Sequence, residues 1–121
     1  MYKAITLLFE LVLLLKLNHW ITASYAQHKA TDEAIETLTK LQDRFVETYL
    51  DSPEAKAKLH KAYNATFKIR PVTDKHVPIL ITKAREEFIK LKIEDDRRDV
   101  TNVIDDIIEA LSHSLYLLTL K

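Results

Sequence analysis

The chain of 121 residues contains no glycine, although average usage would place roughly eight in a protein of this length. Tight hairpin turns between antiparallel strands depend on residues with positive φ, which glycine supplies most readily. The sequence therefore argues against an antiparallel β fold. Leucine, alanine, lysine, glutamate and isoleucine dominate the chain, and these residue types favour helices. We predict an all-α fold.

Length and charge restrict the classes of protein that fit. A chain of this length builds one hydrophobic core, so we predict a single domain over residues 1–121. Its 18 basic and 18 acidic side chains cancel, and no long-range field attracts nucleic acid or an anionic membrane. We expect neither as a partner and expect a cytoplasmic location. Without cysteine, disulfides, Cys-ligated zinc and thiol catalysis are excluded.

One stretch departs locally from this charge balance. Basic residues recur there with few acids nearby, at Lys56, Lys58, Lys61, Lys68 and Arg70. A patch that contacts phosphate groups is the alternative interpretation of this stretch, beside an ordinary solvated surface.

The apolar N-terminal stretch MYKAITLLFELVLLLKLNHWITASYA shares a basic start and an A-x-A-like end with secretory signals. Glu10 interrupts its apolar run, and the about 13 residues between Lys3 and Lys16 are fewer than the ~20 that a bilayer requires. We therefore predict a helix from about Tyr2 to Thr22 that is buried on most of its circumference. It carries more apolar surface than its own chain can cover, which predicts a subunit interface.

The period of the apolar residues predicts three further long helices, over about 24–50, 77–93 and 97–119. Ser52 and Pro53 indicate a restart as N-cap and first helical residue. A short helix should follow to about Tyr63, and residues 64–76 should form a connection. We predict a four-helix bundle, ferritin-like or generic, with a short extra helix between the second and third long helices.

The second long helix carries a group of candidate metal ligands. On a regular helix the four residues His28, Asp32, Asp43 and Glu47 fall within an arc of about 100°. This arc lies beside and opposite the face that carries the apolar residues of the helix. His28 can share an ion with Asp32, and Asp43 with Glu47, because residues four apart are neighbours. The two pairs lie roughly 16 Å apart along the axis. One copy of the helix cannot bring all four to one metal.

Two antiparallel copies of this helix could complete the site. A two-fold axis near its middle would set His28 and Asp32 of one chain against Asp43 and Glu47 of the other. His19, at the end of the first helix, could then close the half-site. Mixed imidazole and carboxylate ligands suit Fe(II), Mn(II) or Zn(II). We therefore expect at least a dimer, formed through the first two helices.

The H-x-x-x-D and D-x-x-x-E pairs, with 15 residues from His28 to Asp43, resemble the Dps-type mini-ferritins. His19 with Trp20 is similar to the His-Trp pair that ends the first helix of that family. The resemblance implies an iron-oxidising site shared between subunits, with His19, His28, Asp32, Asp43 and Glu47 as metal ligands. It also implies the short helix after the second long one. The segment HWITASYAQH is similar to short ferritin-like proteins of tailed phages and large viruses, which implies the host cytoplasm or the virion as the location.

The chain departs from the mini-ferritin pattern in three ways. His28 follows His19 by only nine positions, which is fewer than usual in the family, and the chain is shorter than a typical mini-ferritin. It also lacks a basic tail, so the DNA binding of that family is not implied. The competing interpretation is an assembly or structural protein, viral or otherwise, whose acidic side chains are merely solvated. Glu109 with His113 is a weaker candidate pair, and Glu10 must be paired, protonated or at an interface.

Overall fold

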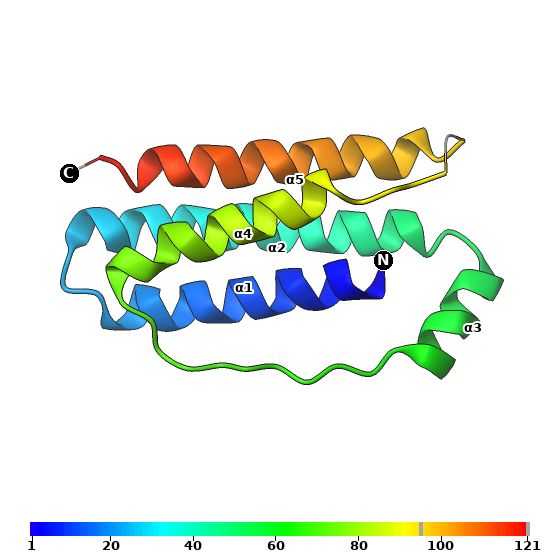
Figure 1. Ribbon diagram of the computed structural model, residues 1–121, viewed down its shortest axis with the longest axis horizontal. Coiled ribbons are helices and arrows are strands. Elements are labelled where there is room, and N and C mark those ends of the chain that lie inside the picture. The colour runs from blue at the N-terminus through cyan, green and yellow to red at the C-terminus, as the bar shows by residue number, and fades with distance from the viewer. Residues whose placement is uncertain (95, 121) are drawn as a thin grey trace.

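The computed structural model describes residues 1–94 and 96–120, and within these ranges it contains helices and no strand (Figure 1). The five α-helices are α1 (Tyr2–Ile21), α2 (Tyr25–Tyr49), α3 (Pro53–Ala62), α4 (Val77–Ile89) and α5 (Arg98–Leu117). A single 3₁₀ turn, η1 (Asp74–His76), leads into α4. The prediction of an all-α fold with a short helix after the second long one is confirmed.

The helices other than α3 pack lengthwise against one another, with α1 against α2, α2 against α5, α5 against α4, and α4 against α1. Residues 63–73, which we call the crossover, run back along α1 between α3 and η1 (Figure 1). Because of this return, α4 points in the same direction as α2, and each packed pair is antiparallel (Figure 1). The bundle therefore consists of two helical hairpins joined by one long connection.

The core lies between these four helices. Phe45 in the last turns of α2 and Phe88 in the last turn of α4 meet edge to face toward one end of the core, with ring centroids 5.8 Å apart. This geometry is the preferred one for aromatic pairs. The same cluster contains the apolar residues that the helical period placed on the inner faces, among them Leu8, Leu15, Leu38, Val77, Ile81, Val103, Ile107 and Leu111. By contrast, α3 has no buried residue.

By length and composition alone, α1 could cross a membrane, since an 18-residue window of it has a mean hydropathy of 1.6. In the fold it serves as a core helix instead. Eight of its residues are buried, against α2 and α4 and under the crossover. Leu8 and Leu15 are completely enclosed. The prediction that most of its circumference is buried is met only in part, because fewer than half of its residues are buried and an apolar strip remains exposed.

Helix ends are formed without left-handed backbone. No residue that the structure describes has positive φ. The side chains of Ser24 and Ser52 accept hydrogen bonds from the backbone N–H groups of Gln27 and Ala55, which satisfies two of the free donors at the starts of α2 and α3. The predicted cap at Ser52, with Pro53 as the first helical residue, is confirmed.

The predicted end of the third long helix is wrong. The sequence period extends it to about residue 93, whereas α4 ends at Ile89. The backbone N–H groups of Lys90 and Leu91 cap its last turn by bonding to carbonyls of that turn. Leu91 and Ile93 still pack against the core from the irregular segment that follows. The helical spacing of these apolar residues therefore indicates that they are buried, but it does not indicate that the helix continues to them.

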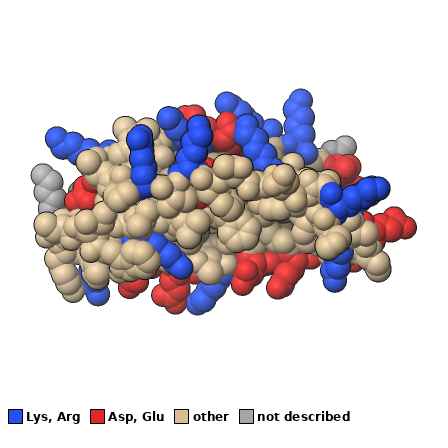
Figure 2. All heavy atoms as spheres, turned by 90° about the horizontal axis from the view of Figure 1, so that it is seen from below, with Lys and Arg blue, Asp and Glu red and all other residues tan. Residues whose placement is uncertain are grey.

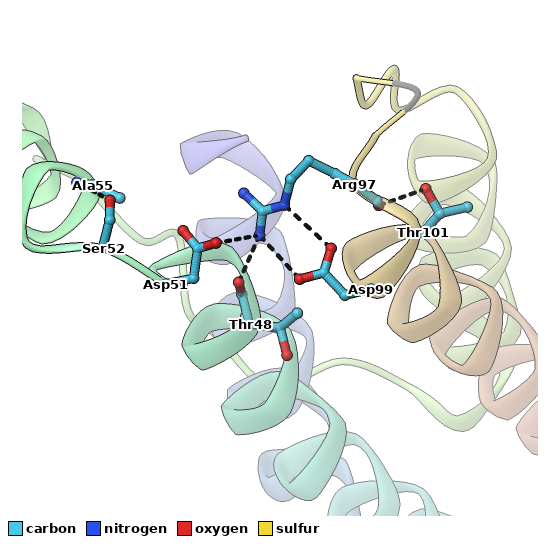
Figure 3. A network of polar contacts seen from close by, with 7 residues as sticks. All are labelled: Thr48, Asp51, Ser52, Ala55, Arg97, Asp99 and Thr101. Carbon is cyan, nitrogen blue, oxygen red and sulfur yellow. Dashed lines mark hydrogen bonds and ion pairs between the residues drawn. The ribbon is translucent and has the colours of Figure 1, made fainter.

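Arg97 links the end of α2 to the start of α5 (Figure 3). Its guanidinium donates to the carbonyl of Thr48 at 2.7 Å and to the Asp99 carboxylate at 3.2 Å, and it lies 3.6 Å from Asp51. The bond to Thr48 occupies a carbonyl that the end of a helix leaves free. Asp99 lies in the first turn of α5, where a negative charge is favoured by the helix dipole.

We expect replacement of Arg97 by Gln to lower the free energy of unfolding by about 1–3 kcal/mol at neutral pH, because a charge-assisted bond to a backbone carbonyl is lost. The melting temperature should fall by roughly 4–12 °C, measured by circular dichroism. Lys40→Gln is the matched control. It breaks an exposed pair with Glu36 that is worth at most about 0.5 kcal/mol, and equal losses in the two variants would contradict the prediction.

The effect of Arg97→Gln should also depend on pH. The hydrogen bond from Arg97 holds the pKa of the Asp99 carboxyl below its ordinary value. A depressed pKa in the folded state contributes stability that is present above the unfolded value of about 3.9 and is lost as the pH falls through the folded value. The difference between wild type and variant should therefore narrow below about pH 4. A constant difference from about pH 7 to about pH 3 would contradict this.

Candidate functional site

His19 and His28 meet at the turn between α1 and α2. His19 lies in the last turn of α1, and His28 lies in the first turn of α2, where its backbone N–H bonds to the carbonyl of the N-cap Ser24. The two imidazole rings stack with centroids 3.9 Å apart and an angle of 21° between their planes. The turn thus joins two of the five predicted ligands into one histidine pair.

The hydrogen bonds of the histidine pair are reciprocal. Nδ1 of His19 lies 2.9 Å from the backbone carbonyl of His28, and Nδ1 of His28 lies 3.0 Å from the carbonyl of His19. A carbonyl oxygen only accepts, so each Nδ1 must carry the proton. In the neutral ring Nε2 is then the nitrogen with the free lone pair. A backbone carbonyl on the other ring nitrogen is the usual support of a metal-binding histidine.

A buried polar network fixes the turn beside the histidine pair. The amide of Asn18, which is almost completely buried, donates to the carbonyl of Val72 at 3.2 Å and to the Asp74 carboxylate at 2.9 Å. Its oxygen accepts from the side chain of Gln27 at 3.0 Å. The hydroxyl of Thr22 donates to the second oxygen of Asp74 at 2.8 Å. The network joins α1, α2 and the end of the crossover.

Thr31 of α2 also contacts the histidine pair. It is buried, its hydroxyl donates to the carbonyls of Gln27 and His28, and its oxygen lies 3.2 Å from Nδ1 of His19. Neither Thr31 nor Asn18 was identified from the sequence. The available signal was a polar residue inside an otherwise apolar helix, directly before His19.

The three predicted carboxylates lie elsewhere on α2. Asp32, Asp43 and Glu47 are all exposed. Asp32 borders a cleft of about 490 Å³ between the start of α2 and the end of α5. Asp43 and Glu47 lie four residues apart toward the other end of α2, about 22 Å and about 28 Å from His28 along the axis. One chain therefore presents the histidine pair and the distal carboxylates separately.

The structure does not bring a complete ligand set together in one copy. Over residues 1–94 and 96–120, no group of three or more histidine, aspartate or glutamate side chains is placed to hold a metal ion. This agrees with the sequence argument that one copy of the second helix cannot suffice. Whether two copies complete the site depends on the surface beside the histidine pair.

That surface carries an apolar strip along α1. Phe9, Leu13 and Trp20 are 43 %, 38 % and 71 % exposed, and their spacing places them on one side of the helix. Figure 2 looks onto α1 and the crossover and shows a band of uncharged atoms along the length of the molecule. Basic side chains crowd the upper edge of the band, and acidic ones are more frequent along its lower edge.

Glu10 and His113 are accounted for within the chain. Glu10 is half-buried, and its carboxylate accepts a hydrogen bond at 3.2 Å from the backbone N–H of Lys68 in the crossover. It is therefore paired, which was one of the three expected alternatives. His113 is exposed, and its Nε2 lies 3.4 Å from the carboxylate of Glu33 on α2. That contact links α5 to α2.

Comparison with known proteins gives one match. A model of a family described as a family of unknown function (DUF5856) matches residues 19–118. The matched region begins at His19 and includes every predicted ligand. Searches of curated proteins and of solved structures found no match.

The hydrogen bonds of the histidine pair predict one tautomer for both rings. In alkaline solution, where imidazoles are neutral, nitrogen-15 NMR should show a protonated Nδ1 and an unprotonated Nε2 at His19 and His28. His60 lies on the exposed surface of α3 and serves as the reference, since free neutral imidazole exchanges between both tautomers. A protonated Nε2 at His19 or His28 would contradict the assignment.

Proposed function

The chain belongs to this family of unknown function, and we propose from its own geometry that it binds divalent metal ions at sites shared between two copies. The observation that carries the proposal is the histidine pair. Each imidazole is held at Nδ1 by a backbone carbonyl and leaves Nε2 free as a ligand, and fixing the tautomer in this way raises affinity for a metal. Carboxylates that project from the same helix supply the harder oxygen ligands.

A second copy is the source of the missing ligands. Packing α1 and α2 against the same helices of a partner, across a two-fold axis, would cover the apolar strip of Phe9, Leu13 and Trp20. Because α2 would then lie antiparallel to its partner, Asp43 and Glu47 of one chain approach His28 of the other. Burial of exposed apolar side chains provides the driving force for this association.

The chain's connectivity agrees with the resemblance to mini-ferritins. Two helical hairpins joined by one long crossover form the plan of ferritin-like bundles, and the crossover of residues 63–73 has that course. On this basis the preferred metal is Fe(II), with Mn(II) or Zn(II) as alternatives. Iron at such a site would be the substrate of a ferroxidase and would supply one electron to an oxidant. The ligands are His19, His28, Asp32, Asp43 and Glu47.

The second candidate is a helical bundle that assembles without metal. The observation in its favour is the exposure of all three carboxylates, which need no ligand while water solvates them. The same strip on α1 would then serve assembly alone. The two candidates share the dimer and differ in metal binding, so two separate experiments distinguish them.

We expect Leu13→Glu to convert a dimer to a monomer, or to weaken it by at least about tenfold, because it places a charge in an apolar interface. Sedimentation equilibrium measures the effect. Ile79→Glu on α4 is the matched control, since Ile79 is similarly exposed at 48 % and lies outside the strip. A wild-type monomer at micromolar concentration, or equal weakening by both variants, would refute the shared interface.

We expect Asp32→Asn to weaken metal binding by roughly tenfold or more, since losing even a supporting group of a ligand costs about that much. Calorimetric titration with Mn(II), Zn(II) and anaerobic Fe(II) measures the affinity. Glu36→Gln on the same helix is the control, because Glu36 is exposed and pairs only with Lys40 among the residues described. Wild-type protein that dimerises without binding any of the three metals would favour the assembly candidate.

A further inference from the structure

The basic residues of the crossover border a cleft that the proposed metal site does not use. The cleft has a volume of about 560 Å³ and lies between α1, the crossover and the start of α4. This volume is within the range of about 300–1,000 Å³ that small-molecule sites occupy. Its walls are formed by Glu10, Leu14, Lys68, Ile69, Arg70, Val72, His76 and Leu80.

Positive charge predominates at the mouth of the cleft. Lys68 and Arg70 are exposed and His76 is half-buried. The single carboxylate in the walls, that of Glu10, already accepts a hydrogen bond from the backbone of Lys68. Asp74, two residues before His76 in the sequence, directs both of its oxygens to Asn18 and Thr22 instead. The walls therefore carry two side-chain cations against one carboxylate, which leaves a net positive charge for an anionic group of a ligand.

The floor of the cleft is apolar. Leu14 is buried, Val72 and Leu80 are half-buried, and Ile69 is 39 % exposed. A floor of aliphatic side chains under a cationic mouth matches a ligand with a hydrocarbon tail and one negative head. The forked guanidinium of Arg70 suits a carboxylate, which it can hold through two parallel hydrogen bonds.

We propose that this cleft binds a small amphiphilic carboxylate, of the kind represented by a medium-chain fatty acid. A nucleotide fits less well, because the aliphatic floor offers no hydrogen bonds to a sugar or a base. The carboxylate lies at the mouth against Arg70 and Lys68, and the acyl chain covers Leu14 and Leu80. This assignment is independent of the metal site, which lies at the turn between α1 and α2.

Titration of isotope-labelled protein with monomeric decanoate, followed by NMR, tests the proposal. Chemical shifts should change at residues 68–76 and at Glu10, Leu14 and Leu80, and the changes should saturate. Decan-1-ol, which has the same tail without the charge, should bind more weakly. Arg70→Gln should weaken decanoate binding by roughly fivefold to tenfold, because a charge-assisted hydrogen bond is lost at a partly open site.

Lys56→Gln is the matched control, since Lys56 is an exposed basic residue of α3 that does not line the cleft. It should leave decanoate binding unchanged. Equal binding of decanoate and decan-1-ol, equal effects of the two variants, or shifts outside the cleft would overturn the proposal. Binding to anionic phosphatidylglycerol vesicles without binding to monomeric decanoate would also overturn it and would indicate a membrane surface instead.

Discussion

The apolar circumference of α1 is the constraint on which the rest of the structure depends. Two neighbouring helices cover only part of a helix, and here α2 and α4 occupy two sides of α1. The crossover lies against a third side through contacts that pair Tyr63 with Thr6, Phe67 with Phe9, Lys68 with Glu10 and Val72 with Asn18. It covers this side only in part, since Phe9 is still 43 % exposed. The same connection returns the chain to the end of the bundle where α2 begins (Figure 1). The crossover that packs on α1 therefore also sets the direction of α4 and the antiparallel packing of the two hairpins.

The geometry of the histidine pair follows from that covering. Asn18 is buried because the crossover closes over it, and a buried amide must find partners. It finds them in the crossover and in Gln27 of α2. Those bonds fix the end of α1 beside the start of α2. The next residue in each helix is a histidine, and the rings of His19 and His28 stack, each with its Nδ1 bonded to the backbone carbonyl of the other. A structural network thereby orients the candidate ligands.

Local patterns in the sequence predicted the features that local forces determine. The cap at Ser52 and the spacing of Phe45 and Leu38 on α2 depend on residues within a few positions. The end of α4 was misjudged because Leu91 is apolar for a tertiary reason. The partners of Asn18 in the crossover and in η1 lie more than fifty residues away, and no short-range period encodes them. For the same reason, the stacking of the two histidines was not predicted, although both residues were identified.

The single crossover has a consequence for how the chain reaches this state. Contacts within each hairpin join neighbours in the sequence and close quickly, whereas contacts between the hairpins require closure of a long loop at a cost in entropy. Among small proteins of similar stability, folding is slower when the residues in contact lie farther apart in the sequence. Formation of each hairpin should therefore be fast, and docking of the second hairpin onto the first should limit the rate. Until that step is complete, the most apolar helix of the chain is covered by α2 alone, and the period before docking is when aggregation competes with folding.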